Sequence, residues 1–184
     1  MHKLDNKLLI ENIYTNIVKT SRNKSVFLDY KVDDTVEGRF DIILLHSFII
    51  FNYFISTGKS KSKLPQLLFD HMFSDFDSNL REMGFGDIAV NKRMKQFIKA
   101  FYGRIDNYTK SLLLFNESNN FTMLTETISR NIYKEKTVEV ECIEFWKNYI
   151  VSNIDYINSN TLDDNIDNLF SFNELKIWLK KIIM

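Results

Sequence analysis

The chain has 184 residues, 45% of them hydrophobic and 26% charged, and this is the size and composition of one soluble globular domain. Intrinsic disorder and collagen-like repeats are excluded, and the scarcity of glycine (5) and proline (1) disfavours an all-β sandwich or barrel. Net charge is zero, with 17 Lys and Arg against 13 Asp and Glu in residues 1–110 and 7 against 11 in residues 111–184, which is far from the basic surface of a dedicated nucleic-acid binder.

Apolar residues at three- and four-residue steps predict helices along most of the chain. The first covers residues 4–19. The second begins at Asp34, which has capping-box spacing to Glu37, and ends near Ser56, before Gly58. Its apolar stretch is 14 residues long, shorter than the roughly 20 that a membrane span needs, so we expect a central core helix.

Glycine and proline punctuate the next two helices. Pro65 is expected at the first position of the third helix, which ends at the Gly84–Gly86 turn, and Asp87 is expected to cap the fourth. Further helices are predicted over residues 119–133, over residues 137–158, and after a Ser171–Glu174 capping box. The sequence therefore predicts an all-α fold, a single-domain bundle of about six to seven helices over residues 1–184.

Two glycines fall inside predicted helices, where each costs about 1 kcal/mol relative to alanine. Gly38 and Gly103 are each followed by arginine and flanked by aromatic residues or close to them. The physical reason to expect glycine there is close approach of another backbone or of a ligand. A helix crossing and a ligand contact both remain open.

Catalytic and metal-binding templates fit the sequence poorly. The three histidines form no His-Glu-x-x-His or Glu-x-x-His pattern, and there is no Walker motif or Gly-x-Ser-x-Gly elbow. Cys142 cannot form an internal disulfide, and its neighbours Glu141 and Glu144 would raise the pKa of its thiol. We expect no enzyme, metal or cofactor. His46 is the one residue for which haem ligation stands as a hypothesis beside a hydrogen-bonded core histidine.

Four blocks of sequence occur in a characteristic order. They are Asp34-Thr-Val-Glu-Gly-Arg-Phe-Asp41 with Leu45-His46, Leu68-Phe-Asp70, Leu80-Arg-Glu-Met-Gly84 with Gly86-Asp87, and Phe101-Tyr-Gly-Arg104. In this order and spacing they resemble the ubiquinol–cytochrome c chaperone family. The resemblance covers about residues 26–115, a family-like core, and leaves residues 116–184 as a helical extension.

The resemblance implies an all-helical, non-enzymatic chaperone that binds newly made cytochrome b and promotes assembly of ubiquinol–cytochrome c reductase (complex III). Another complex III subunit, a small assembly partner and the ribosome are further implied partners, because similar mitochondrial proteins act with a small subunit near the ribosomal tunnel exit. The N-terminal residues do not read as a transit peptide. We therefore expect a bacterial member in the cytoplasm, peripheral to the inner membrane, rather than one on the mitochondrial matrix side.

The family-like blocks supply the candidate client-binding residues, which either contact the client or form internal ion pairs behind the contact surface. These candidates are Gly38, Arg39, Asp41, Arg81, Glu82, Tyr102, Gly103 and Arg104. A basic group on the fourth helix is expected to steer an acidic partner, or alternatively to bind RNA or the ribosome, although no specific nucleic acid is expected. It comprises Lys92, Arg93, Lys95 and Lys99. A basic loop that could touch anionic headgroups holds Lys59, Lys61 and Lys63.

Overall fold

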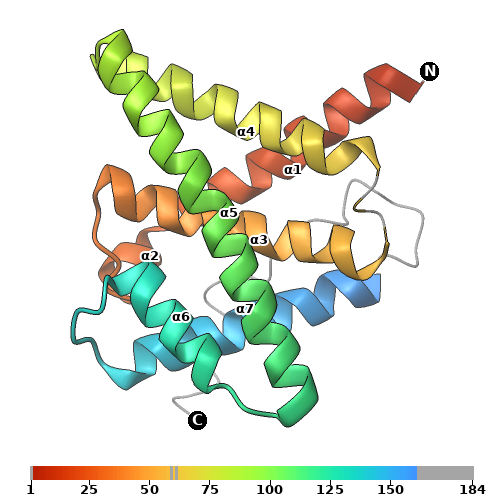
Figure 1. The fold of residues 1–184 in the computed structure, drawn as a ribbon, viewed down its shortest axis with the longest axis vertical. Coiled ribbons are helices and arrows are strands. Elements are labelled where there is room, and N and C mark those ends of the chain that lie inside the picture. The colour runs from red at the N-terminus through yellow and green to blue at the C-terminus, as the bar shows by residue number, and fades with distance from the viewer. Residues whose placement is uncertain (1, 59, 61, 161–184) are drawn as a thin grey trace.

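A computed structural model describes residues 2–58, 60 and 62–160, and it places seven helices and no strand among them (Figure 1). The helices are α1 (His2–Ser21), α2 (Lys24–Leu28), α3 (Val36–Ser56), α4 (Lys63–Glu82), α5 (Asp87–Ser118), α6 (Thr122–Tyr133) and α7 (Val140–Asn160). The predicted all-α, single-domain bundle is thus confirmed. The helix predicted after Ser171 lies outside the described residues.

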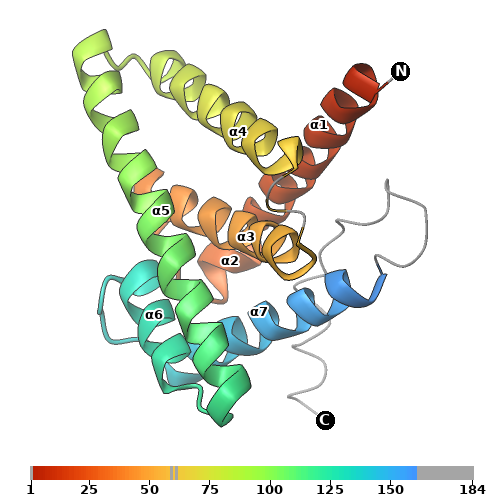
Figure 2. The same cartoon turned by 45° about the vertical axis from the view of Figure 1, so that its right-hand side comes forward.

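Helix α3 is the centre of the bundle, with α1, α5, α6 and α7 packed around it (Figure 2). Every residue from Phe40 to Ile50 is buried, as a helix that is apolar nearly all round requires. The helix has 21 residues and by length and composition could cross a membrane, so the 14-residue apolar stretch underestimated its length, although its place as the central core helix is as predicted. However, 72% of its apolar window is buried inside the protein, as in the core helix of a globular domain.

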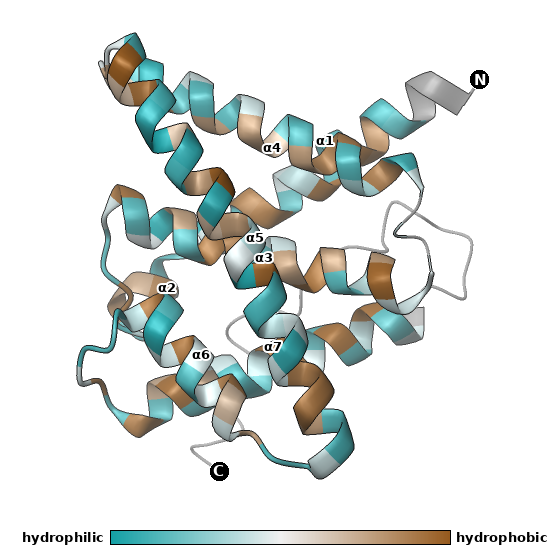
Figure 3. Cartoon of the chain, in the orientation of Figure 1, coloured by the Kyte–Doolittle hydropathy of each residue, from teal (hydrophilic) through white to brown (hydrophobic). Residues whose placement is uncertain are grey.

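Helices α4 and α5 form an antiparallel hairpin whose turn lies away from the rest of the bundle (Figure 2). Phenylalanine rings hold the two helices together. Phe73 meets Phe101 at 5.7 Å between ring centroids, and Phe76 meets Phe97 at 6.0 Å, both edge to face. The turn itself depends on Gly84, whose φ of 86° lies in the left-handed region that glycine enters without strain. Hydrophobic residues also occur at this tip (Figure 3).

Two helix starts differ by one residue from the prediction. The N-cap of α3 is Thr35 rather than Asp34, because the Gly38 N–H donates to the Thr35 hydroxyl at 3.0 Å. Asp34 is then free to bind Arg39. In α5 the N-cap is Gly86, and the expected cap, Asp87, is the first helical residue.

The start of α4 also corrects the sequence prediction. The helix begins at Lys63, with Ser62 as the N-cap, so Pro65 is its third residue rather than its first. Proline is tolerated throughout this first turn because the first N–H groups of a helix have no intrahelical acceptor.

The two helical glycines have different environments. A Cβ atom at Gly38 would lie 2.0 Å from the carbonyl oxygen of Asp33, so the chain that leads into α3 requires glycine there, and neither another helix nor a ligand does. At Gly103, no atom lies within 4 Å of such a Cβ. Close backbone approach is therefore found at Gly38, although the neighbour is the segment that leads into α3. At Gly103 no described residue makes a close approach, so a helix crossing is the wrong expectation there, and a ligand contact stays a prediction.

Candidate client-binding surface

Asp41 is the centre of a buried polar cluster that joins three helices. Arg104 of α5 donates from Nη2 to the Asp41 carboxylate at 2.5 Å, and Lys134, just beyond α6, forms an ion pair with the other carboxylate oxygen. The side chains of Asp41 and Arg104 are only 2% and 16% exposed. Burial raises the pKa of the Asp41 carboxyl, and the two cations oppose that shift. For Asp41 and Arg104 the geometry matches the internal ion pair that the sequence left as an alternative.

The remaining arginines of the candidate surface are more exposed, and each is paired. Arg39 makes two hydrogen bonds to Asp34, from Nε at 2.6 Å and from Nη2 at 3.1 Å. Arg81 binds Asp77 and also reaches Asp87 across the hairpin turn. Because the Arg39 and Arg81 side chains are 50% and 46% exposed, they remain within reach of a partner. Glu82 is exposed beside them.

Arg93 links the hairpin to the core helix. Its guanidinium donates to Glu37 of α3 at 2.7 Å and lies over the Phe85 ring, 4.6 Å from the centroid. This ion pair lowers the pKa of the Glu37 carboxyl. Arg93 therefore has a structural role in the folded protein, which distinguishes it from the three lysines with which it was grouped on the basis of the sequence.

Those lysines form an exposed row on α5. Lys92, Lys95 and Lys99 recur at three- and four-residue steps on one helix face, and none makes an ion pair to another residue that the structure describes. Tyr102 continues the row and is 59% exposed. We define these four residues as the lysine face. The exposed Lys63 begins α4, whereas Lys59 and Lys61 lie outside the described residues.

His46 is fully buried in α3, and both of its ring nitrogens have partners. Nδ1 lies 2.9 Å from the Ile42 carbonyl oxygen and from the Ser21 hydroxyl, and Nε2 lies 2.9 Å from the Tyr149 hydroxyl. Neither nitrogen is available to a haem iron, which contradicts the haem hypothesis. Among residues 2–58, 60 and 62–160, no three His, Cys, Asp or Glu side chains gather as a metal site.

The burial of His46 should make the folded protein less stable in mild acid. Burial lowers the pKa of this imidazole from 6.5 to about 4, so the unfolded chain binds a proton below pH 6.5 that the folded protein excludes. The free energy of unfolding should therefore be fully retained above pH 6.5 and should fall by about 2 kcal/mol between pH 7 and pH 5. Urea unfolding at each pH measures this. His46→Gln should lack that component, and an identical pH slope in the variant would contradict the assignment.

Cys142 is an unsuitable nucleophile. The residue is buried, and its Sγ lies 3.6 Å from a carboxylate oxygen of Glu139. Burial and this carboxylate raise the pKa of the thiol. The direction agrees with the sequence prediction, although the acidic neighbour responsible is Glu139 rather than Glu141 or Glu144.

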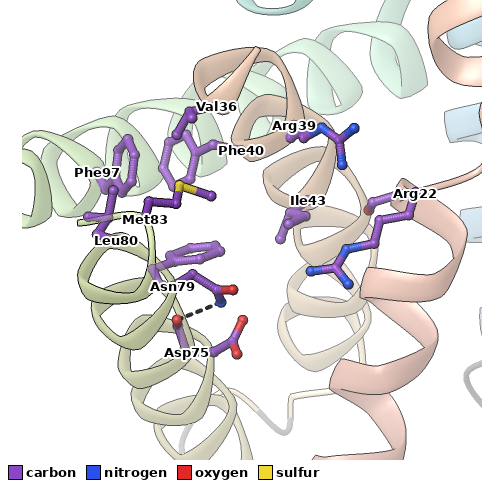
Figure 4. Close-up of a pocket in the computed structure, with 12 residues that line it drawn as sticks. Arg22, Val36, Arg39, Phe40, Ile43, Asp75, Asn79, Leu80, Met83 and Phe97 are labelled. Atoms are coloured by element: carbon purple, nitrogen blue, oxygen red, sulfur yellow. Dashed lines mark hydrogen bonds between the residues drawn. The ribbon is translucent and has the colours of Figure 1, made fainter. Parts of the chain in front are cut away.

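A cavity of about 120 Å³ opens where α1, α3 and the α4–α5 hairpin meet (Figure 4). Its apolar wall includes Phe40 of α3, Phe76 of α4 and Phe97 of α5. Arg22, Arg39, Asp75 and Asn79 supply its polar wall. Arg22 was not among the candidate residues predicted from the sequence, and no motif marks it.

The comparisons with known proteins agree with this helical architecture. The model of the family described as Ubiquinol-cytochrome C chaperone matches residues 28–179. The chain belongs to the ubiquinol-cytochrome c chaperone family. The resemblance carried by the four sequence blocks is thus confirmed, and the match to this chaperone family extends well past residue 115.

Two curated relatives carry the name ubiquinol-cytochrome c reductase complex assembly factor 1. The protein of Mus musculus is 22% identical over 158 residues, and that of Homo sapiens is 23% identical over 158 residues. Each alignment covers 86% of this chain but only 52% and 51% of the relatives, so the chain spans about half their length. The crystal structure of the Cbp3 homolog from Brucella abortus has a TM-score of 0.74 and 26% identity, and the match covers 92% of this chain and 91% of that one.

Proposed function

We propose that this protein is a non-enzymatic assembly chaperone for ubiquinol–cytochrome c reductase, and that its client is newly made cytochrome b. The observation that carries the proposal is the family match over residues 28–179. The names of the two curated relatives, which are assembly factors of this complex, support the same process. The structure adds a helical bundle with an exposed basic face on α5, which suits binding to a client.

We assign client contact to the exposed side of the family-like blocks. Arg39 and Arg81 offer partly exposed guanidinium groups, with Glu82 nearby, whereas Asp41 and Arg104 hold α3 and α5 together behind them. The lysine face supplies long-range attraction to an acidic client segment. Gly38 is required by the chain that leads into α3, and neither Gly38 nor Gly103 makes a client contact in this proposal.

Reversing the charge of the lysine face tests this assignment. The triple variant Lys92→Glu, Lys95→Glu, Lys99→Glu should recover several-fold less pulse-labelled cytochrome b on co-precipitation, because rim charges govern the rate of encounter. Its thermal stability should remain near that of the parent, since the three side chains are exposed and unpaired among the described residues.

A control for charge change away from the lysine face is Lys19→Glu with Lys24→Glu, two exposed lysines of α1 and α2 that make no ion pair among the described residues. This double variant should capture cytochrome b as the parent does. Unchanged capture by the triple variant, or an equal loss in the control, would remove the lysine face from the mechanism.

The alternative function is RNA or ribosome binding by the same face, which the exposed Tyr102 ring favours because it could stack on a base. RNA affinity would then fall steeply with salt, with a slope set by the number of phosphate contacts. Measuring the binding of a single-stranded RNA at several salt concentrations distinguishes RNA binding from the chaperone function. We propose the chaperone function because the family match supports it.

We further propose that the protein works in the bacterial cytoplasm at the surface of the inner membrane, where a cytochrome b client would be inserted. The exposed Lys63 at the start of α4 would contact anionic headgroups together with Lys59 and Lys61. The burial of α3 supports a peripheral rather than a spanning attachment. Another complex III subunit, a small assembly partner and the ribosome remain proposed partners of the same complex.

A further inference from the structure

The cavity beside Phe40 has a size that limits what can occupy it. Its volume is about 120 Å³. Cofactors and drug-sized ligands occupy pockets of roughly 300–1,000 Å³, whereas an apolar cavity of about 150 Å³ accepts a molecule the size of benzene. At about 120 Å³ the cavity is smaller than that, so it suits one aliphatic side chain such as leucine or methionine and not a cofactor or drug-sized ligand.

The wall chemistry favours an apolar group at the base of the cavity. Phenylalanine rings from three helices meet there, with Phe40 stacked on Phe97 at 3.9 Å and edge to face with Phe76 at 5.3 Å. Met83 lines the same cavity and is 58% exposed, at the end of α4. An exposed methionine at the mouth of an aromatic cavity can repack around different side chains.

The polar wall holds one arginine whose charge is not taken up by an ion pair. Arg22, Arg39 and Asp75 line this wall, and Arg39 is already bound to the Asp34 carboxylate by two hydrogen bonds. The Asp75 carboxylate already accepts a hydrogen bond from the Tyr14 hydroxyl at 2.7 Å. Arg22 is exposed, and its guanidinium makes no hydrogen bond or ion pair to the residues described by the structure. Figure 4 shows this side chain extended toward Asp75 and Asn79 across the opening. The cavity thus presents an unused cation beside an apolar base.

We infer that this cavity is a socket for one large apolar side chain of a partner helix that carries an acidic residue one turn away. The apolar side chain enters between Phe40, Phe76 and Phe97, and the carboxylate binds Arg22 at the opening. Residues one turn apart on a helix lie about 5–6 Å from each other, which spans the distance from a small cavity to its edge. The inference rests on the proposed function, since the partner helix belongs to the client.

A synthetic helical peptide tests the socket directly. The probe is an alanine- and glutamine-based peptide of about 16 residues with one Leu and a Glu four positions later. Methyl-labelled protein should show shifts at Met83 and Ile43, which line the cavity, and none at Ile128 on α6. Changing the peptide Leu to Ala, or its Glu to Lys, should weaken binding at least about tenfold. Equal binding of all three peptides, or no binding of the parent peptide, would overturn the inference.

Two protein variants separate the two parts of the socket. Val36→Phe should fill the cavity and abolish the peptide shifts. The protein variant Arg22→Glu should weaken binding of the parent peptide by the same factor as the Glu→Lys change in the peptide weakens binding to the parent protein. Binding should be restored when the Arg22→Glu protein meets the Glu→Lys peptide. Lys24→Glu makes the same charge change two residues away, at a position that does not line the cavity, and should bind normally. Loss of binding in Lys24→Glu equal to that in Arg22→Glu would contradict a specific carboxylate contact.

Failure of the socket and failure of the chaperone function give different results. If the peptide does not bind but a deletion strain lacks complex III, the socket is wrong and the assembly function stands. If the deletion strain assembles complex III normally, the assembly function fails, and the inferred client helix fails with it.

Discussion

Arg104→Met should lower the free energy of unfolding by about 3 kcal/mol, the largest effect expected from a single charged residue in this protein. The substitution keeps an apolar stem but removes the cation 2.5 Å from a carboxylate that is 2% exposed. Lys134 alone, itself 43% exposed, then has to compensate the Asp41 charge. Urea unfolding with linear extrapolation measures the change.

Two controls show whether the loss comes from the buried charge. Lys110→Met breaks an ion pair with Asp106 on the same helix, where the side chains are 59% and 57% exposed, and should cost less than about 0.5 kcal/mol. Asp41→Asn combined with Arg104→Met removes both charges and should be more stable than Arg104→Met alone. A loss below about 1 kcal/mol for Arg104→Met would mean that this arginine is not structural and is available to the client.

Gly38→Ala should destabilise the fold by about 2 kcal/mol, although alanine is the better helix former. The added methyl group would lie 2.0 Å from the Asp33 carbonyl oxygen, so the segment that leads into α3 has to move. That movement also disturbs the Thr35 cap, which accepts from the Gly38 N–H. Chemical unfolding and the circular dichroism of the folded state together measure the effect.

Gly103→Ala is the matched control, because it makes the same change inside α5 with no atom within 4 Å of the new methyl group. It should stabilise the protein by about 0.5–1 kcal/mol through helix propensity. Changes of opposite sign in the free energy of unfolding of the two alanine variants would confirm that the two glycines differ in environment. Equal effects would contradict the close approach at Gly38.

Local signals explain which parts of the fold were predictable. The core helix α3 was evident because its residues are apolar on every side, and the α4–α5 turn because glycines interrupt the helical pattern. Exact helix starts were less predictable, since Asp34 and Thr35 are adjacent and both residue types cap helices well. The choice between them depends on Arg39, which binds Asp34 in the folded protein.

Long-range geometry explains the rest. Gly38 and Gly103 have similar local sequence, and only the path of the chain at Asp33 makes one of them necessary. The ion pair between Asp41 and Lys134 joins residues 93 positions apart. It depends on the backbone of Lys134 itself, which follows α6 in the left-handed conformation with a φ of 55°. The cavity is formed where α1, α3, α4 and α5 meet, so no single segment could have predicted it.

The measurement that tests the account most directly is deletion of the gene in its host, followed by reduced-minus-oxidised spectra of the membranes. The account predicts selective loss of the cytochrome b signal that belongs to complex III, with the other oxidases unchanged, and recovery when the gene is restored. Normal complex III in the deletion strain would contradict the assembly function, and it would show that this chain shares the family's fold without its role.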